Sequence, residues 1–551
     1  MQSLIAQGAL IIWPVVALVL FMVLPAGRAV IWTILAGYLL LPVGISFDLP
    51  GVPAMDKSSI PNLVAIILAP LFARSGEFRW PRSPVVKLLM LIWVLVPIGT
   101  MLNNGEPLIV GMSVRPGLGW WDALSMAIGN ALELVPFLLG AALLAHEQGH
   151  RDIVKAVVLA ALAYSLPVLA EIRLSPILQT WIYGVGSVEF FLQQIRGSGF
   201  RAMVFLGHGL LISTFLAMAV LGALGLWKAG VKLVGMSAVL LAVYLAIVLL
   251  LNKTMGAILL VLVLVPALLF IRQRTLLASI FLIGAVVATY PLARGTNLLP
   301  LQSIINAAGQ ISPARAESFE FRVRNETLLL NRAAEKPVFG WGSYGRNRVI
   351  VEQGWGEGFT DLTVTDGTWI IVAGTFGWAG YISCFGLLCY PFLRGFRLRR
   401  GALPVITLAL LTMHLLNVLD LIPNSSLRPL TWLIAGALAN MTRLSMREGR
   451  YDGARTSCSR NDPPRERGAG DPLALGFSTD RRYNPARGNP LGLTEALSQP
   501  QRADLEGGKT GRSLLFETRI GGSLHLRFAV VQTSVYAFPI ASFTRVSNAK
   551  F

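Results

Sequence analysis

Charged residues are scarce in this sequence. They make up only 14% of the 551 residues, whereas 54% are hydrophobic, and the mean hydropathy is +0.62. Soluble globular chains carry about 25% charged residues, so this composition excludes a soluble protein. The apolar runs are long and unbroken, which excludes a β-barrel, because barrel strands alternate polar and apolar residues. We therefore expect an all-α, polytopic bundle of transmembrane helices.

Cysteines and the motifs of soluble enzymes are also scarce. The three cysteines, Cys384, Cys389 and Cys458, cannot form a disulfide framework, and we expect the first two to be small packing residues of one span. The sequence contains no P-loop, GxSxG, HExxH or paired CxxC motif. It also lacks the Asp-x-Asp pair that holds a metal-bound nucleotide-sugar. Chemistry that depends on ATP or a nucleotide-sugar therefore has little support.

Apolar runs of membrane-spanning length are abundant. We expect about 12–13 spans, near residues 9–27, 29–45, 60–73, 84–103, 123–145, 153–172, 202–224, 233–251, 255–270, 276–293, 367–391, 402–422 and 430–442. The first run has no basic segment before it, so we expect it to stay in the membrane. Clusters of lysine and arginine follow odd-numbered spans, which places those loops in the cytoplasm. This rule accounts for the net charge of +18 without a nucleic-acid partner.

Two long segments lie outside these spans. Residues 294–366 form a large outward loop, which the orientation places in the periplasm. From about Arg447 the composition shifts to Arg, Gly, Pro, Ser and Asp, which cannot build a core. We therefore divide the chain into a membrane domain, residues 1–445, and a cytoplasmic, low-complexity and disordered tail, residues 446–551.

The large loop is predicted to be helical. Ser312-Pro313 is typical of an N-cap followed by proline at the first helical position, and Pro337 should end the helix that runs from Ala314 to Glu335. Helical spacing places four residues on one face of this helix: Arg315, Phe319, Arg322 and Glu326. Arg324 lies on another face. A glycine-aromatic turn that includes Trp341 and Tyr344 follows.

Residues 196–209 form the most specific stretch, where an outward loop re-enters the membrane. Arg196 and Arg201 flank the glycines of this stretch, and His208 follows seven residues after Arg201. That spacing should place Arg201 and His208 on one helix face, about 10 Å apart along the axis. Arginine suits bidentate capture of phosphate or diphosphate. Alternatively, the two arginines anchor lipid headgroups, and His208 packs in the core.

Five other polar residues are expected to have structural roles. His414, Asn417 and Asp420 share an inward stripe of a late span, where interhelical hydrogen bonding is favoured over catalysis. His146 and His150 are expected to be surface residues of a cytoplasmic loop.

This layout resembles the O-antigen ligase and polymerase family. Residues 318–324 and 331–342 are similar to the family's pattern of serine-x-x-x-arginine, helix, proline and x-x-glycine-x-glycine. The resemblance covers residues 9–442 in architecture and 190–380 in motif, and the tail has no counterpart. It implies a multi-pass glycosyltransferase of the bacterial cell inner membrane that uses an undecaprenyl-diphosphate-linked glycan, with no nucleotide-sugar, metal or cofactor.

The resemblance also implies roles for individual residues. Arg322 occupies the position of the family's loop arginine, and Arg196 and Arg201 occupy those of the preceding outward loop. Ligase members place a His-Asn pair where the large loop re-enters the membrane, but here Asp366-Gly367 occupies that place. This departure disfavours a ligase and makes Asp366 the candidate base, unless it only caps the span.

We therefore expect a polymerase that joins lipid-linked repeat units into O-antigen or exopolysaccharide and releases undecaprenyl diphosphate. Arg196, Arg201 and Arg322, helped by Arg324, would clamp the diphosphate. The proton of the acceptor hydroxyl would pass to Asp366, Glu326 or His208. The expected substrate-binding residues also include Arg315, Trp341 and Tyr344.

The expected partners are membrane lipid, a flippase and a chain-length regulator. One alternative function is a ligase that transfers the finished glycan to a lipid or protein. Another is a transporter of lipid-linked glycans, which should carry charges near the bilayer midplane on paired broken helices.

Overall fold

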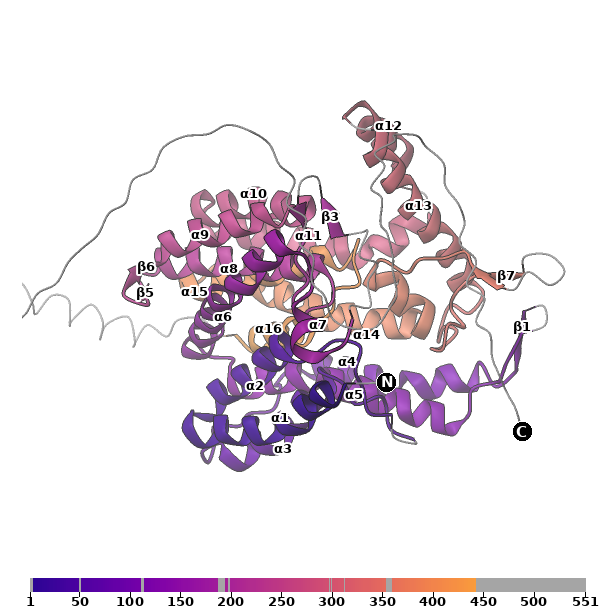
Figure 1. Cartoon of the computed structure of the whole chain (residues 1–551), viewed down its shortest axis with the longest axis horizontal. Helices are drawn as coiled ribbons and strands as arrows, with labels where there is room; N and C mark the ends of the chain where they lie inside the picture. Colours follow the sequence, from indigo (N-terminus) through magenta and orange to yellow (C-terminus); the bar gives the residue numbers. More distant parts are fainter. Residues whose placement is uncertain are drawn as a thin grey trace, which may run out of the picture. The chain divides into compact units, whose positions relative to one another are not determined.

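The computed structural model describes residues 3–48, 51–110, 113–186, 194–196, 199–296, 298, 300–311, 313–352 and 359–441 (Figure 1). These residues all belong to one unit of the chain, Met1–Asp462. The predicted tail, residues 446–551, lies outside the described residues.

Every one of the thirteen expected spans corresponds to an apolar helix. They are α1 (Leu4–Val23), α2 (Ala26–Leu40), α3 (Ser59–Phe72), α4 (Pro84–Leu102), α5 (Trp120–Leu143), α6 (Glu147–Leu174), α8 (Gly209–Lys228), α9 (Ala238–Leu251), α10 (Met255–Phe270), α11 (Gln273–Gly295), α14 (Thr368–Leu398), α15 (Val405–Asp420) and α16 (Pro429–Ala439). Within the described ranges, α1, α4, α5, α6, α8, α11 and α14 are long and apolar enough to cross a membrane, and the other six are shorter. The protein is therefore an all-helical, multi-pass membrane protein, as predicted.

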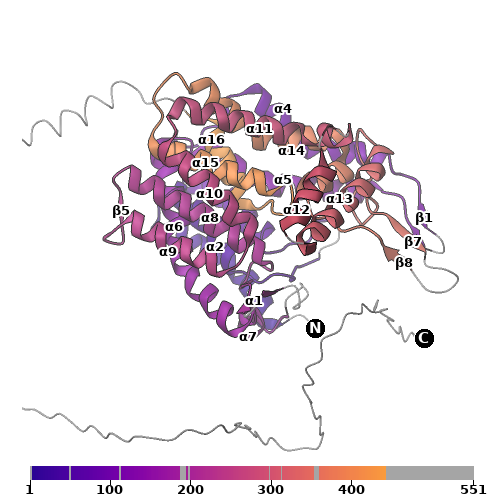
Figure 2. The same ribbon diagram turned by 90° about the horizontal axis from the view of Figure 1, so that it is seen from above.

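The remaining elements are short or belong to the large loop. They are the helices α7 (Leu178–Tyr183), α12 (Leu301–Ile311) and α13 (Pro313–Ala334), and the antiparallel pairs β1 (Leu108–Val110) with β2 (Ser113–Arg115), β3 (Ile195–Arg196) with β4 (Gly199–Phe200), β5 (Lys232–Leu233) with β6 (Met236–Ser237), and β7 (Ile350–Glu352) with β8 (Phe359–Asp361). Helix α13 begins at a proline and ends before Pro337, which confirms the predicted loop helix. Figure 2 shows α12 and α13 on the same side of the bundle as the hairpin β7–β8.

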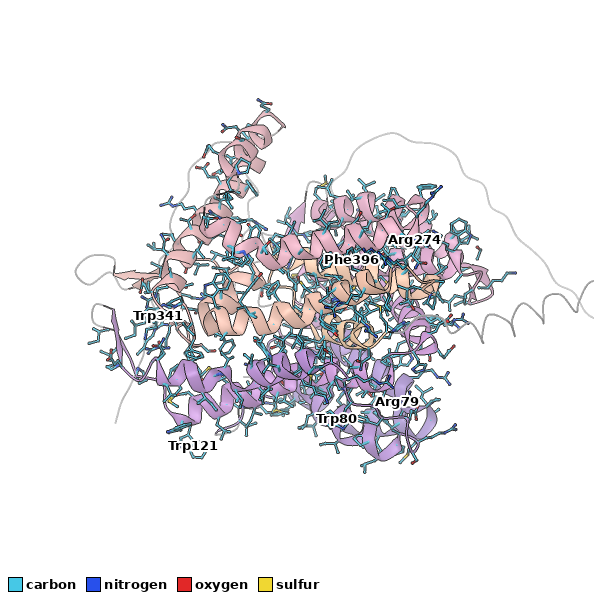
Figure 3. All side chains as sticks on the ribbon, turned by 180° about the vertical axis from the view of Figure 1, so that it is seen from behind. Arg79, Trp80, Trp121, Arg274, Trp341 and Phe396 are labelled. Carbon is cyan, nitrogen blue, oxygen red and sulfur yellow. The ribbon has the colours of Figure 1, made fainter. Side chains whose placement is uncertain are left out.

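Residues that the predicted topology assigns to opposite faces of the membrane lie toward opposite ends of the bundle. In Figure 3, Arg79 and Arg274, from predicted cytoplasmic loops, lie near one end. Trp121 and Trp341, from predicted outward segments, lie near the other. The arrangement agrees with loops that alternate between two sides, and the assignment of each side to a compartment stays a prediction.

Helix α14 is broken at Gly377, whose φ of 63° and ψ of −160° are not helical. The backbone of residues 337–342 lies against this break and exchanges four main-chain hydrogen bonds of 2.7–3.1 Å with residues 374–379. A Cβ at position 377 would overlap the carbonyl oxygens of Pro337 and Val338, so the close approach requires glycine. The turn that follows α13 is thereby fixed to a membrane helix.

Candidate functional site

A cavity of about 740 Å³ is lined by four arginines, Arg201, Arg322, Arg348 and Arg428. Three distant parts of the chain meet there: residues 201–211, the large loop at 321–366, and the loop that joins α15 to α16 at 424–428. Among the lining residues that the structure describes, Asp366 is the only carboxylate. The lining therefore carries an excess of positive charge, which is the expected environment of an anion-binding site.

The segment from Arg201 to His208 is an irregular turn, whereas the sequence predicts a helix from residue 202. Val204, with φ of 45°, and Gly207, with φ of 80°, have left-handed backbones that interrupt a right-handed helix. His208 is the N-cap of α8, and its Nδ1 accepts a hydrogen bond of 3.0 Å from the Leu210 N–H. The prediction that Arg201 and His208 share a helix face is therefore wrong. Both residues nevertheless line the same cavity.

Side chains of α6 and of the loops beside α9 and α3 hydrogen-bond the backbone of this turn. The bonds run from Met203 N–H and Val204 N–H to Glu171 Oε2 (2.8 and 2.7 Å), from Ala202 N–H to Asn252 Oδ1 (2.9 Å), from Phe205 N–H to the Tyr164 hydroxyl (3.1 Å), and from Lys57 Nζ to the Phe205 carbonyl (2.6 Å). Each buried donor left unpaired would cost about 1–3 kcal/mol. Polar side chains inside a membrane bundle thus hold the turn that carries Arg201 and His208.

A glycine makes room for the Arg201 side chain, which is buried. Gly209 begins α8 directly beneath it, and a Cβ there would overlap the Cδ of Arg201. The Gly-His-Gly sequence after residue 206 therefore serves two purposes. Gly207 supplies the left-handed backbone, and Gly209 admits the arginine.

On α13, Arg322 faces Asp366 across the cavity. The Arg322 Nε lies 3.7 Å from Asp366 Oδ2, and its Nη1 donates to the Pro423 carbonyl at 3.2 Å. Burial raises the pKa of the Asp366 carboxyl, and Arg322 opposes this shift. The N-cap of α14 is Gly367, with no side-chain cap bond. The alternative in which Asp366 only caps the helix is therefore wrong, and its carboxylate lies in the cavity instead.

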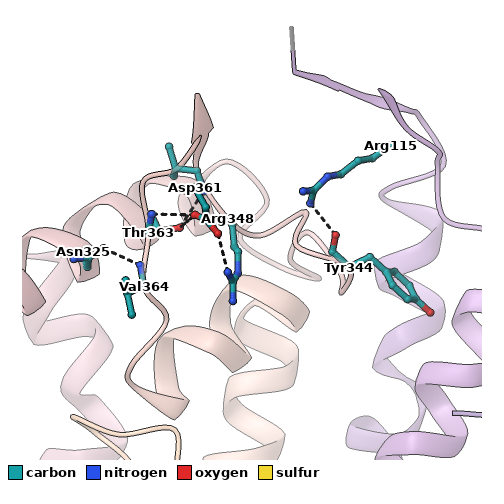
Figure 4. Close-up of polar contacts among 8 residues, drawn as sticks. Arg115, Asn325, Tyr344, Arg348, Asp361, Thr363 and Val364 are labelled. Carbon is teal, nitrogen blue, oxygen red and sulfur yellow. Dashed lines mark hydrogen bonds and ion pairs between the residues drawn. The ribbon is translucent and has the colours of Figure 1, made fainter. Parts of the chain in front are cut away.

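Sequence reasoning did not include Arg348 among the site residues. Its Nη1 forms an ion pair of 2.7 Å with Asp361 Oδ2, next to Thr363, as Figure 4 shows. Burial alone would raise the pKa of Asp361, but bonds from Arg348 and Thr363 outweigh it and lower the pKa. Asn325 Oδ1 accepts the Val364 N–H at 2.9 Å, which ties the segment after β8 to α13.

Arg428 was missed as well. It precedes α16, and its guanidinium donates to the carbonyls of Leu427 and Ser425 at 3.2 and 3.3 Å. A signal for this residue exists in the sequence. The short loop 423–429 follows an even-numbered span, and a cation on that predicted outward side departs from the positive-inside pattern.

Glu326 shares a helix face with Phe319 and Arg322, as predicted, because all three line a smaller adjoining cavity of about 160 Å³. It does not line the arginine cavity. Its carboxylate accepts hydrogen bonds of 3.3 Å from Arg294 and from the Tyr290 hydroxyl. Burial raises the pKa of Glu326, and the Arg294 guanidinium opposes this shift. The observed role of Glu326 is to hold α13 against α11.

Three other expected site residues whose side chains the structure describes, Arg324, Trp341 and Tyr344, do not line the arginine cavity. Arg324 is exposed on α13. Trp341 is buried beneath Arg332, whose guanidinium carbon lies 3.4 Å from the ring centroid. Tyr344 lines a separate cavity. Arg196 belongs to β3 and Arg315 to α13, but the structure does not describe the side chains of these two residues.

Two of the polar residues of α15 make the predicted interhelical contacts. The His414 Nε2 lies 2.7 Å from the Leu388 carbonyl oxygen. Asp420 Oδ2 accepts from the Thr214 hydroxyl at 3.0 Å, which joins α15 to α8. Asn417 is buried on the same helix.

The prediction that His150 is a surface residue is wrong. It is buried, and its ring nitrogens lie 2.8 Å from Thr407 Oγ1 and 3.2 Å from the Ala437 carbonyl. The reason is that α6 begins at Glu147, so His150 lies within the first turn of a packed helix. His146 is exposed, as expected.

The two cysteines of α14 pack among hydrophobic side chains of the core. Cys384 is fully buried, and Cys389 Sγ lies 3.7 Å from the Gly284 carbonyl. Among the described residues, no group of three or more His, Cys, Asp or Glu side chains could hold a metal ion.

Comparison with known proteins identified no relative. No family model matches the chain, and no curated protein or solved structure is significantly similar to it.

Proposed function

We propose that this protein is a glycosyltransferase of the bacterial inner membrane that polymerises undecaprenyl-diphosphate-linked repeat units into O-antigen or exopolysaccharide at the periplasmic face. One observation carries the proposal: among the described lining residues, four arginines and a single carboxylate surround a cavity at the ends of apolar helices. A diphosphate on a polyprenyl chain has the two properties that this cavity can bind, a negative charge and a long hydrocarbon chain. Its charge fits the guanidinium groups, and its hydrocarbon chain fits the apolar helix faces.

The cavity residues support a displacement at the anomeric carbon of the donor sugar. The acceptor hydroxyl oxygen forms the new bond to this carbon, while the bond to the diphosphate oxygen breaks and its electron pair leaves with the diphosphate. The negative charge that grows on the leaving group is stabilised by the arginines. Asp366 takes the proton of the acceptor hydroxyl, because its raised pKa makes it a better base than an ordinary aspartate.

A transporter of lipid-linked glycans is the second candidate, because α14 is discontinuous at Gly377 and broken helices often frame transport sites. In transporters of that kind, the break lines the binding site. Here the break is occupied by the backbone of residues 337–342, and the cationic lining lies on loops and helix ends. The enzyme is therefore the better supported of the two.

Purified full-length protein provides the direct test. We would supply a lipid-linked repeat unit, extracted from a polymerase-deficient strain, and follow glycan length on gels and released undecaprenyl diphosphate by mass spectrometry. A ladder of longer glycans, with one diphosphate lipid released per bond, is expected. A single transfer to a lipid or protein acceptor would identify a ligase. Passage of the labelled lipid across vesicles without a new bond would identify a transporter and contradict the proposal.

A further inference from the structure

A second cavity, of about 510 Å³, adjoins the arginine cavity. Ser425 and Arg428 line both, so the two share a wall at the loop between α15 and α16. The chemistry of the second lining is different. It combines three aromatic rings, those of Trp93, Tyr344 and Phe376, with hydroxyl and amide side chains of α5 and α14. Aromatic faces beside a few placed polar groups suit a ring-shaped, hydroxylated ligand.

Glu133 is the only carboxylate among the described residues of this second lining. It lies on α5, a helix of membrane-spanning length, where an ionisable side chain is a functional candidate. Its Oε1 accepts a bond of 3.3 Å from the Trp432 indole, and no described residue bonds the other oxygen. One turn earlier on α5, the amide nitrogen of Asn130 donates to the Trp93 carbonyl at 2.9 Å. The amide oxygen of Asn130 therefore points away from the Trp93 carbonyl.

Tyr344 is held in an unusual backbone conformation at the edge of the same cavity. Its φ of 61° is uncommon for a residue with a side chain, and such conformations concentrate at functional sites. The Arg115 Nη1 fixes it by donating to the Tyr344 carbonyl at 2.8 Å. Figure 4 shows the ring directed away from Arg115, and the residue is 61% exposed although it is aromatic. An exposed ring with a fixed backbone is suited to stack on a ligand.

We propose that the second cavity binds the acceptor, a carbohydrate, with Tyr344 against a sugar face and Glu133 accepting hydrogen bonds from sugar hydroxyls. This inference rests on the proposed function in one respect, that the carbohydrate is the acceptor of the transfer. Arg428 then lies between the two substrates, because it lines both cavities. Glu133 and Tyr344 would determine which acceptor is used, while the arginines bind the donor diphosphate.

Two variants and a matched control test the proposal. Glu133→Gln keeps the size of the side chain but removes its charge, and Tyr344→Ala removes the ring. Glu317→Gln, at an exposed position of α13 outside both cavities, is the control. The probes are undecaprenyl diphosphate and the repeat-unit oligosaccharide released by hydrolysis of the host polymer. Binding of the first is measured by native mass spectrometry, and binding of the second by saturation-transfer NMR.

The two site variants should weaken oligosaccharide binding, and raise the KM for the acceptor, about 10–100-fold, because hydrogen bonds to a charged group are the strong ones. Binding of undecaprenyl diphosphate and thermal stability should stay at the wild-type level, and the control should behave as wild type. Oligosaccharide binding that is unchanged in both variants would overturn the acceptor site. If wild type binds the oligosaccharide through Glu133 but never transfers it, the proposed function fails and the carbohydrate site remains.

Discussion

Two groups of arginines in this protein have the same chemistry and opposite surroundings. Arg294 and Arg346 are 5% and 3% exposed, and their guanidinium groups bond to the chain itself. Arg346, for example, donates to the carbonyls of Pro116 and Glu106 at 2.9 and 3.0 Å. Arg322 and Arg348, in contrast, line the cavity and have side chains 38% and 44% exposed. Each is paired with one carboxylate, Arg322 with Asp366 and Arg348 with Asp361.

The difference separates arginines that bond to the chain from arginines that we propose to bind a ligand. A buried guanidinium needs partners from the chain itself, because an unpaired buried charge is costly. A guanidinium at the wall of a cavity keeps donors for an anion. Sequence position does not reveal this, since Arg294 and Arg322 both belong to the same large loop region. The following experiments test the distinction, in order of decreasing effect.

The first variant removes a structural arginine. Arg294→Met leaves Glu326 buried without its cation and should cost about 3–5 kcal/mol in the free energy of unfolding. Denaturant unfolding in detergent measures this. The double variant Arg294→Met with Glu326→Leu should recover much of the loss, because it leaves no buried charge. A single variant as stable as wild type would contradict the structural role of Arg294.

The second variant changes an arginine of the cavity. Arg322→Lys keeps the charge but loses the planar fork, so we expect about 10²–10³-fold less polymer formation, comparable to the loss of one transition-state donor. Stability should be nearly unchanged, because the pair with Asp366 is more than a third exposed. Arg324→Lys is the matched control, two residues away and exposed. Equal losses in the two variants would remove the special role of Arg322.

The third variant tests whether Arg201 depends on the turn that carries it. Glu171 accepts three backbone N–H bonds, from Met203, Val204 and Leu178, and an amide in its place accepts fewer. Glu171→Gln should therefore cost about 1.5–3 kcal/mol and reduce activity as well. Thermal unfolding and polymer assays measure both effects. Glu147→Gln, at the exposed start of the same helix, should be close to wild type, and activity that survives in Glu171→Gln would contradict the dependence.

The fourth variant concerns a lysine that is buried beside the cavity. Burial lowers the pKa of Lys57 to about 7, and Arg428 adds to this shift, while Asp56 opposes it. An unfolded lysine keeps its proton to about pH 10.4, so the unfolded state binds more protons between these two values. Stability should therefore rise with pH from about 7 toward 10, because the cost of burying the ammonium is relieved. Thermal midpoints should show this rise in wild type and less of it in Lys57→Met, and identical pH profiles would disprove it.

The helices were predictable because length and apolarity alone determine them. A run of apolar residues between charged loops has few alternatives in a membrane, and each of the thirteen expected segments overlaps an apolar helix. The limits of α13 were also predictable, because Pro313 and Pro337 act locally. Four of the residues selected from the sequence, Arg201, His208, Arg322 and Asp366, line one cavity, and their roles stay predictions.

The rest depended on contacts between distant residues. Residues 202–206 are apolar and indicate a helix, but their conformation is set by Glu171 and Asn252, which lie far along the chain. Helical spacing grouped Glu326 with Arg322 correctly but could not show that Arg294 would bond it. The only sequence signal for Arg428 as a site residue is that a cation lies in a short loop on the predicted outward side, because no sequence motif includes it.

The break in α14 has a consequence for how the protein is made. Residues 337–342 leave the ribosome before residues 374–379, so the main-chain partners of the turn do not yet exist when the large loop is synthesised. The loop that carries Arg322 and Arg348 becomes fixed only after α14 has emerged. Arg428 follows later still. The arginine cavity is therefore completed near the end of membrane insertion, and a partly synthesised chain lacks it.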